Sequence, residues 1–284
     1  MSRTIRNRIL REFVERSLKE DVGDGDHSSL SCIPPLAGGN ARLIVKDRGI
    51  IAGTRVAREV FSIVDKSLVF DLHINDGNPV NPGDIVFKVS GRQQSILKSE
   101  RLVLNIMQRM SGIASITRQY VDQTAGFKAK ILDTRKTTPG MRFLEKEAVR
   151  TGGGYNHRMG LYDMIMLKDN HIDYAGGIES AILRAREYLQ KNNLMLKIEI
   201  EARNLDEVRR IINAGGVDRI MLDNFSITDT MEAVAMIDGR CETESSGGIT
   251  LDDVRKYAEC GVDFISAGFL THSVRSLDMS LKAF

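Results

Sequence analysis

Apolar residues recur at helical spacing at the start of the chain. Between residues 3 and 20, positions such as Ile5, Ile9 and Phe13 alternate with charged residues. Apolar residues that return every three or four positions are typical of an amphipathic helix, so we predict a helix over 3–20. Residues 96–125 show the same pattern and predict a second, longer helix.

Between the two predicted helices the pattern changes to short β-branched runs. Residues 41–91 contain several apolar stretches that are separated by Gly, Asn and Pro. Short runs bounded by these residues are typical of strands and turns. We therefore expect the first part of the chain to form an α+β domain.

After residue 125 the chain repeats a unit of one strand and one helix. Short apolar strands alternate with amphipathic segments, and the strands end near Asp133, Lys168, Glu201, Asp223, Ser246 and Ala267. The last four ends are 22, 23 and 21 residues apart. This rhythm predicts parallel strands joined by right-handed crossovers. Six units are fewer than the eight of a complete (β/α)8 barrel.

Polar or small residues stand at every one of these strand ends. In parallel α/β folds, ligands bind at the carboxyl edge of the sheet, toward which helix N-termini also point. A single Lys or Asp at a strand end is usually only solvated, but six such ends in series favour a ligand site. The residues concerned are Asp133–Gly140, Lys168–His171, Glu199 with Glu201, Asp223–Asn224, Ser245–Gly248 and Ser266–Gly268.

The charges of the chain nearly cancel, with 40 Lys and Arg residues against 38 Asp and Glu. A net charge of +2 gives no global field to hold a polyanion, so we predict no nucleic-acid partner. Locally, however, the charges separate. Residues 135–171 carry seven cations and four acids, whereas residues 199–247 carry eleven acids and five cations.

Each charged region favours a different part of a substrate. Arg, Lys and His side chains suit carboxylates, which Arg binds through forked hydrogen bonds. Acidic side chains that converge suit Mg²⁺ brought in with substrate phosphates. The small-residue turns 245–248 and 266–268 favour phosphate binding by backbone N–H groups. The sequence thus predicts an anionic carboxylate substrate and a phosphorylated one, bound with Mg²⁺ and without an organic cofactor.

Cysteine content and hydropathy indicate the cellular environment in which the protein works. Cys32, Cys241 and Cys260 are far apart and form no CxxC pair, so neither a disulfide framework nor a zinc site is indicated. No apolar run approaches the roughly 18 residues needed to span a bilayer, and the first residues lack the apolar core of a signal peptide. We expect a cytoplasmic protein without a membrane partner.

Several segments together carry a more specific pattern. DTRKTTPG at 133–140, NHR at 156–158 and KDNHI at 168–172 occur with IEIEAR at 198–203, SSGG at 245–248 and ISAG at 265–268. In this combination the chain resembles the quinolinate phosphoribosyltransferase family, also called nicotinate-nucleotide pyrophosphorylase (carboxylating). The upstream segments EDVGDGD, GIIAG and SERLVLN match the family too. The resemblance therefore spans nearly the whole chain.

The resemblance implies both a reaction and a fold. Such an enzyme is a pentosyltransferase that converts quinolinate and 5-phosphoribosyl 1-diphosphate to nicotinate mononucleotide, pyrophosphate and CO₂ in de novo NAD synthesis. The implied fold class is α/β, with an N-terminal α+β sandwich domain followed by an incomplete, open α/β barrel of about six parallel strands. We place the sandwich at 1–108, with 273–284 returning to it, and the barrel at 109–272.

The resemblance also implies roles for residues and a partner. Arg135, His157 and Arg158 resemble the groups that grip the two quinolinate carboxylates, and family members are homodimers or hexamers in which Arg101 is donated to the neighbouring subunit's site. Lys136, Lys168, Glu201 and Asp223 are the implied catalytic residues, with Glu201 and Asp223 also holding Mg²⁺ directly or through water or substrate. The complete implied substrate-binding set is Arg101, Thr134, Arg135, Lys136, His157, Arg158, Lys168, Glu199, Glu201, Asp223, Ser246, Gly247, Gly248, Ala267, Gly268 and His272.

Some alternatives stay open at this point. Without the resemblance, Arg101 is an ordinary solvent-facing helix residue, and His171 is interpreted as a structural histidine bonded near a strand end. A paralogue associated with molybdate transport keeps the phosphoribosyl site and can use another acceptor, although the retained TRKTTPG, NHR and KDNH segments favour quinolinate. A non-catalytic phosphate- or nucleic-acid-binding protein is disfavoured, because the chain has no Trp and such a site needs neither Glu201 nor Asp223.

Overall fold

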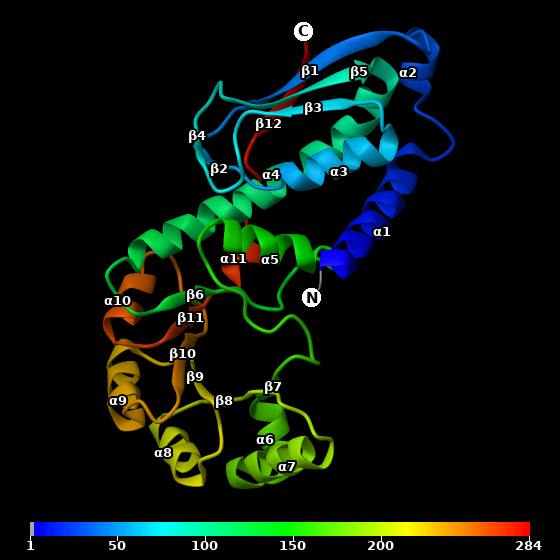
Figure 1. Ribbon diagram of the computed structural model, residues 1–284. Helices are drawn as coiled ribbons and strands as arrows, with labels where there is room; N and C mark the ends of the chain where they lie inside the picture. The colour runs from blue at the N-terminus through cyan, green and yellow to red at the C-terminus, as the bar shows by residue number, and fades with distance from the viewer. Residues whose placement is uncertain (1–2) are drawn as a thin grey trace. The chain divides into compact units, whose positions relative to one another are not determined.

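The computed structural model describes residues 3–284, and contacts divide the chain into two compact units. The first unit comprises the chain up to Ile116 together with Pro139–Gly153 and Val274–Phe284. The second comprises Thr117–Thr138 and Gly154–Ser273. Figure 1 shows the elements of both units in chain colours.

The first unit is built on an antiparallel sheet with helices on one side of it (Figure 1). Its strands β1 (Gly38–Val45), β3 (Val69–Leu72), β5 (Ile85–Arg92) and β12 (Met279–Ala283) pair in the order β12-β1-β5-β3, and β2 (Gly49–Ile50) pairs with β4 (Pro79–Val80). Its helices are α1 (Arg3–Val22), α2 (His27–Cys32), α3 (Thr54–Val64), α5 (Arg142–Thr151) and the first part of α4 (Gln93–Gln123).

The four-stranded sheet buries alternate residues. Ala41, Leu43 and Val45 of β1 are buried, whereas the residues between them are less so. This period of two is typical of a sheet that packs on one face only. Phe61 of α3 meets Phe87 of β5 edge to face, with ring centroids 5.9 Å apart, in an arrangement that aromatic pairs favour.

Helix α3 was not predicted, because it lies in the stretch where the sequence indicated strands and turns. Its buried residues Val56, Ala57, Val60 and Phe61 follow helical spacing. Gly53 precedes the helix with φ +98°, a conformation that side chains disfavour. β-Branched residues therefore occur here on a helix face, where packing outweighs their strand preference.

The second unit contains six parallel strands and their connecting helices. The strands β6 (Lys130–Leu132), β7 (Ile165–Leu167), β8 (Ile198–Ala202), β9 (Arg219–Asp223), β10 (Glu242–Ser246) and β11 (Phe264–Ser266) pair in the order β6-β11-β10-β9-β8-β7. The helices are α6 (Asp169–Ala175), α7 (Ile178–Lys191), α8 (Leu205–Ala214), α9 (Ile227–Ile237), α10 (Val254–Glu259) and α11 (Phe269–His272).

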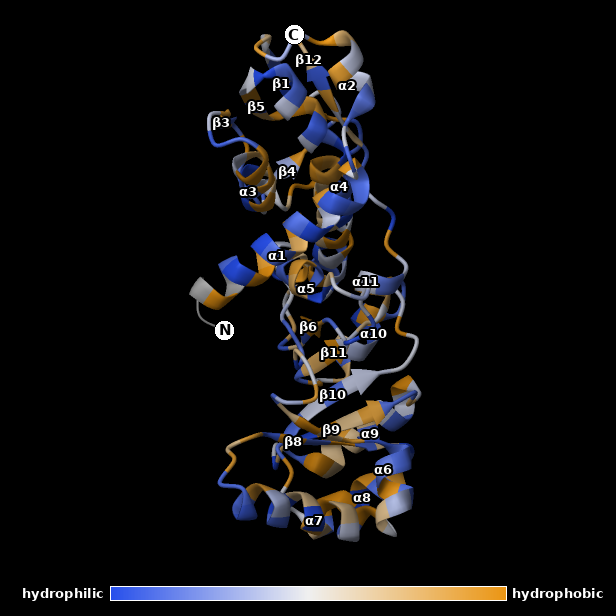
Figure 2. Cartoon of the chain, turned by 90° about the vertical axis from the view of Figure 1, so that its right-hand side faces the viewer, coloured by the Kyte–Doolittle hydropathy of each residue, from blue (hydrophilic) through white to orange (hydrophobic). Residues whose placement is uncertain are grey.

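The strand order is that of a barrel with one open seam. Within this sheet, β11, the last of the six strands in sequence, pairs with β6, the first of them, whereas β6 and β7 are the two edges of the sheet. Figure 2 shows both hydrophobic and hydrophilic residues on α7, as expected for an amphipathic helix of an α/β layer. The predicted fold class, an N-terminal α+β domain and an open α/β barrel with six parallel strands, is confirmed. None of the helices within residues 3–284 combines the length and apolarity that crossing a membrane needs.

Candidate active site

A pocket of about 600 Å³ opens at the carboxyl edge of the six-stranded sheet, within the second unit. Residues at or just beyond the carboxyl ends of the six strands line it, together with His157 and Arg158 from the loop before β7. The predicted site residues that line it are Thr134, Arg135, Lys136, His157, Arg158, Lys168, Glu201, Asp223, Ser246, Gly247, Gly248, Ala267, Gly268 and His272. Met166, Met221 and Phe269 add apolar wall.

Asp133, at the end of β6, anchors one side of the pocket. Its side chain is fully buried, and its Oδ1 accepts a hydrogen bond from the backbone N–H of His157 at 2.9 Å. The next residue, Thr134, accepts a hydrogen bond from the Lys136 N–H through its Oγ1 at 3.0 Å. These contacts fix the two segments that carry the cationic side chains. The role of Asp133 is therefore to hold the wall of the pocket.

The cationic side of the pocket consists of Arg135, Lys136, Arg158 and Lys168. The Arg158 side chain is largely buried and donates to the carbonyl oxygen of Met164 at 3.2 Å. Burial, and then the nearby charge of Arg135, lower the pKa of Arg158. Arg135 and Arg158 are therefore close enough for their positive charges to repel each other in a partly buried pocket. An anion that binds between them removes this unfavourable interaction.

The acidic side of the pocket is formed by Glu201 and Asp223, at the ends of β8 and β9. Glu201 forms an ion pair with Lys168. Asp223 accepts a hydrogen bond from the side-chain amide of Asn224 at 2.9 Å through one of its two carboxylate oxygens. The Lys168–Glu201 pair thus lies where the cationic and acidic sides meet, and Asp223 keeps an oxygen for a ligand.

A glycine turn follows β10 on the acidic side. Gly247 has φ +102°, and a Cβ placed there would lie 2.3 Å from the Asn224 Oδ1. No residue with a side chain fits this position without displacing Asn224. Such a turn leaves backbone N–H groups accessible to an anion such as a phosphate. Gly268, after β11, is also tightly packed, against Lys136 and His272.

Comparisons with known proteins identify the family to which the chain belongs. Residues 26–111 match the model of the quinolinate phosphoribosyl transferase N-terminal domain, and residues 113–282 match that of the C-terminal domain. The chain belongs to the quinolinate phosphoribosyltransferase family.

Similar proteins of the family cover nearly the whole chain. A quinolinate phosphoribosyltransferase [decarboxylating] 2b, mitochondrial, from Nicotiana tabacum is 44% identical over 96% of this chain and 82% of its own. A probable nicotinate-nucleotide pyrophosphorylase [carboxylating] from Bacillus subtilis is 43% identical over 96% and 92%. The solved structure of nicotinate-nucleotide pyrophosphorylase from Francisella tularensis superposes with a TM-score of 0.92, at 37% identity over 98% and 97%.

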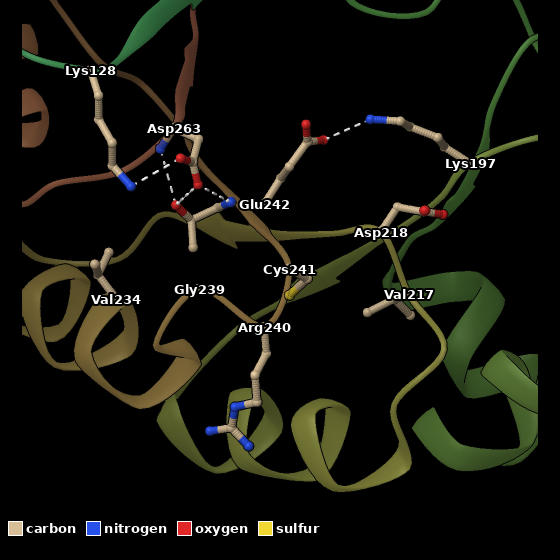
Figure 3. A pocket seen from close by; sticks show the side chains of 11 residues that line it. Lys128, Lys197, Val217, Asp218, Val234, Gly239, Arg240, Cys241, Glu242 and Asp263 are labelled. Carbon is tan, nitrogen blue, oxygen red and sulfur yellow. Dashed lines mark hydrogen bonds and ion pairs between the residues drawn. The ribbon is translucent and has the colours of Figure 1, made fainter.

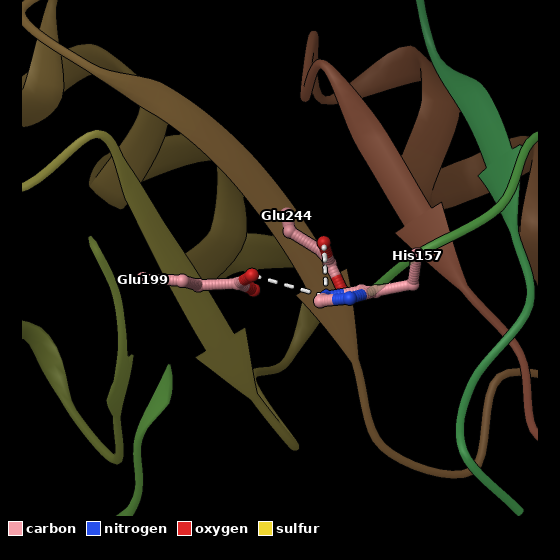
Figure 4. A group of neighbouring side chains, drawn as sticks. All are labelled: His157, Glu199 and Glu244. Carbon is pink, nitrogen blue, oxygen red and sulfur yellow. Dashed lines mark ion pairs between the residues drawn. The ribbon is translucent and has the colours of Figure 1, made fainter. Parts of the chain in front are cut away.

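Glu199 does not line the pocket, although the family resemblance places it beside Glu201. Its side chain is fully buried below the pocket, on the same strand β8. There it faces His157 and Glu244, as Figure 4 shows. Burial raises the pKa of Glu199 to about 7 and that of Glu244 to about 7. The sequence pattern could have indicated Glu244, because alternation along β10 puts it on the same face as Ser246.

Arg101 and His171 are not among the residues that line the pocket. Arg101 is exposed on α4, in the first unit, so its donation to a neighbouring subunit stays a prediction. The ring Nδ1 of His171 accepts a hydrogen bond from the Lys168 backbone N–H at 3.0 Å, where α6 begins. This contact favours the structural interpretation of His171, as part of a helix cap.

Proposed function

We propose that this protein catalyses the transfer of a phosphoribosyl group to quinolinate. The products are nicotinate mononucleotide, pyrophosphate and CO₂, and the reaction supplies de novo NAD synthesis. The observation that carries the proposal is the division of one pocket into a cationic side and an acidic side, joined by Lys168 and Glu201. The family's curated relatives, whose names state this activity, support it.

The cationic side suits a dicarboxylate. Arg135 and Arg158 present guanidinium groups, which bind carboxylates through forked hydrogen bonds, and Lys136 adds a third positive charge. Met166 and Phe269 supply apolar surface against which a flat ring packs. Quinolinate, a pyridine ring with two adjacent carboxylates, matches both properties.

The acidic side suits the ribose and the diphosphate of the second substrate. Glu201 and Asp223 offer oxygen ligands of the kind that Mg²⁺ takes, and Mg²⁺ commonly binds one or two carboxylates together with substrate phosphates. When bound there, the ion would neutralise charge on the departing pyrophosphate. The turn of Ser246, Gly247 and Gly248 is the proposed site of the ribose 5′-phosphate.

The residues of this chain act mainly by position and charge. The pyridine nitrogen attacks the anomeric carbon of the ribose as the bond to pyrophosphate breaks, and positive charge develops on the sugar. The carboxylates of Glu201 and Asp223 stabilise that charge, while Lys136 and Lys168 attract the leaving pyrophosphate. The positive ring nitrogen then stabilises the carbanion left on the neighbouring ring carbon when CO₂ departs, and that carbon takes up a proton from solvent. No side chain has to act as a general acid or base; the protein holds both reactants in line.

The direct test is an assay of the purified protein with quinolinate, phosphoribosyl diphosphate and Mg²⁺. We expect one CO₂ and one pyrophosphate for each nicotinate mononucleotide, no turnover after chelation of the metal, and little product when nicotinate replaces quinolinate. Arg158→Ala should lower kcat/KM for quinolinate by about 100-fold or more, because it removes a charged partner of a carboxylate.

The matched control is Arg209→Ala, which removes an exposed arginine of α8 whose ion pair, within residues 3–284, is with Asp206 at the surface. Its turnover should equal that of the wild type. Absence of nicotinate mononucleotide with the wild-type protein, or unchanged quinolinate kinetics in Arg158→Ala, would overturn the proposal.

We further propose that the enzyme is a cytoplasmic homodimer or hexamer in which Arg101 enters the neighbouring subunit's pocket. The exposure of Arg101 on α4 supports this role. Mixing inactive Arg101→Ala subunits with inactive Lys136→Ala subunits should restore about a quarter of the activity if the subunits form exchanging dimers, since half of the mixed dimers' sites are intact. No recovery from subunits shown to exchange would refute the donation.

A further inference from the structure

We propose that Glu199 is a positioning residue that acts through His157, supported from below by the Arg219–Glu244 ion pair. The proposal deepens the proposed function, on which its kinetic test rests. His157 lines the substrate pocket, whereas Glu199, Arg219 and Glu244 do not. The contact between His157 and Glu199 therefore joins the pocket wall to the buried side chains of the sheet.

Both ring nitrogens of His157 contact groups of the protein. The Nδ1 accepts a hydrogen bond from the backbone N–H of Arg158 at 2.6 Å. A nitrogen that accepts from a backbone N–H carries no proton, so in the neutral ring the proton is on Nε2. Nε2 lies 3.0 Å from the Glu199 Oε2 and 3.5 Å from the Glu244 Oε2. Glu199 is therefore the nearer carboxylate, and its Oε2 is within ion-pair distance of Nε2 although the two atoms form no regular hydrogen bond.

Arg219 holds the two carboxylates beneath the ring. Its Nη1 lies 2.7 Å from the Glu244 Oε2 and 3.9 Å from the Glu199 Oε2. Its guanidinium carbon also lies 3.9 Å from the centroid of the Phe264 ring. Glu199, Arg219 and Glu244 come from the adjacent strands β8, β9 and β10, and the two carboxylates are fully buried. Strand pairing therefore fixes these three side chains more firmly than a loop could.

His157, Glu199 and Glu244 also have the composition of a metal-binding group, with ligand atoms within 4.8 Å of one another. Two contacts argue against a metal ion bound by this group. A metal on Nε2 would require the proton on Nδ1, which would then face the Arg158 N–H, a second donor. The Arg219 guanidinium already occupies the Glu244 Oε2 with its own positive charge.

The contact between His157 and Glu199 affects how the cationic wall of the pocket is oriented. The ring of His157 fixes the backbone N–H of Arg158, and Arg158 is on the cationic side. If the ring loses its contact with Glu199, both the imidazole and the start of the Arg158 side chain gain freedom. The expected cost falls on binding of the dicarboxylate, whereas the glycine turn of the acidic side keeps its geometry.

The contact can be broken from either side. Glu199→Met removes the acceptor and fills its volume, and His157→Asn keeps an acceptor near the Nδ1 position while removing Nε2. We expect each variant to raise KM for quinolinate by about tenfold, the order of effect of losing one buried polar contact, and to leave KM for phosphoribosyl diphosphate within about twofold. Glu199→Gln, which retains an acceptor, should restore most of the loss.

Glu242→Met is the matched control, because Glu242 also pairs with Arg219 but at its Nη2, on the side away from His157. Its kinetics should not change. The double variant Glu199→Met with His157→Asn should be no worse than either single variant, since both remove the same contact. Additive losses, or equal increases in the KM of both substrates, would overturn the proposal.

A spectroscopic measurement separates this inference from the proposed function. Imidazole ¹⁵N shifts of the full-length protein, assigned to His157 through the His157→Asn variant, should show a neutral ring with its proton on Nε2. The Glu199→Met substitution should shift the Nε2 resonance. These results do not require turnover, so a protein that forms no nicotinate mononucleotide would refute the function alone. A proton on Nδ1, or unchanged shifts in folded Glu199→Met, would refute the positioning role.

Discussion

The two edges of the six-stranded sheet carry similar side chains in different arrangements. At the amino edge, a pocket of about 480 Å³ is lined by Lys128, Lys197, Asp218, Arg240, Glu242 and Asp263 together with Cys241 (Figure 3). There Lys128 pairs with Asp263 at 2.9 Å, and Lys197 pairs with Glu242 at 3.1 Å. At the carboxyl edge, Lys136 and Arg158 form no ion pair within residues 3–284.

This difference between the two edges shows that a pocket lined by charged residues is not by itself a binding site. The charges of the amino edge neutralise one another and hydrogen-bond the strand ends, as where Asp263 accepts from the Thr243 N–H at 2.9 Å. The cations of the carboxyl edge gather on one side and the acids on the other. Only the second arrangement leaves interaction energy for a ligand, because unmatched charges are costly until a partner arrives.

The largest difference in turnover is expected between variants of two lysines at opposite edges of the sheet. Lys136→Ala should reduce turnover by about 100-fold to 1,000-fold, because a positive charge beside the leaving pyrophosphate is lost. Lys197→Ala removes an exposed lysine whose partner is Glu242, so turnover should stay within about twofold of the wild type. Steady-state kinetics of the two variants decide the point. Equal losses would mean that the amino edge also takes part in the reaction.

An intermediate effect is expected on stability at the amino edge. Burial opposes ionisation of Asp263, but hydrogen bonds from Lys128 and Thr243 outweigh it and lower the pKa of Asp263. Its contribution to stability is therefore present above the unfolded-state pKa of 3.8 and is lost as the pH falls. Asp263→Ala should lower the free energy of unfolding by about 1–3 kcal/mol at pH 7, and by less near pH 3.

Thermal unfolding at both pH values measures this difference, and kinetics at a temperature where the variant is folded should be unchanged. Glu187→Ala, an exposed residue in the middle of α7, is the control and should lie within about 0.5 kcal/mol of the wild type. A loss of stability that does not depend on pH would show that the carboxylate charge of Asp263 is not what holds this edge.

The smallest effect is expected from the thiol of the amino edge. Burial raises the pKa of Cys241, so little thiolate forms at neutral pH. Cys241 should react with an alkylating reagent more slowly than Cys32, which is exposed. Cys241→Ser should change turnover by less than about twofold, as should Cys32→Ser. Mass spectrometry after timed alkylation gives the order of reaction, and the reverse order would contradict a raised pKa of the partly buried Cys241 thiol.

The sequence predicted the carboxyl edge well because of how parallel strands end. Lys168 and Asp223 each interrupt an apolar run, Glu201 and Ser246 stand at the ends of their strands, and the pairing order brings all four to one edge. The residue roles and the domain boundaries inferred from the family resemblance stay predictions. Geometry nonetheless places nearly the whole implied substrate-binding set in one pocket.

The layer beneath the pocket could not be predicted in the same way. Glu199 and Glu201 lie two residues apart on one strand, and alternation assigns them to one face. Whether a carboxylate on that face reaches the pocket or is sealed below it depends on His157 and Arg219, which come from distant parts of the chain. Likewise, α3 depends on tertiary packing of β-branched residues that short patterns assign to strands.

The close approach of Gly247 to Asn224 bears on how the enzyme can be re-engineered. Because even a methyl group at position 247 would collide with the Asn224 side chain, the turn after β10 and the end of β9 form one interlocked unit. Libraries that randomise this unit will return mostly misfolded or inactive proteins. Diversity aimed at altered acceptors belongs on the opposite wall, around Arg135 and Met166, where side chains can change without breaking the turn.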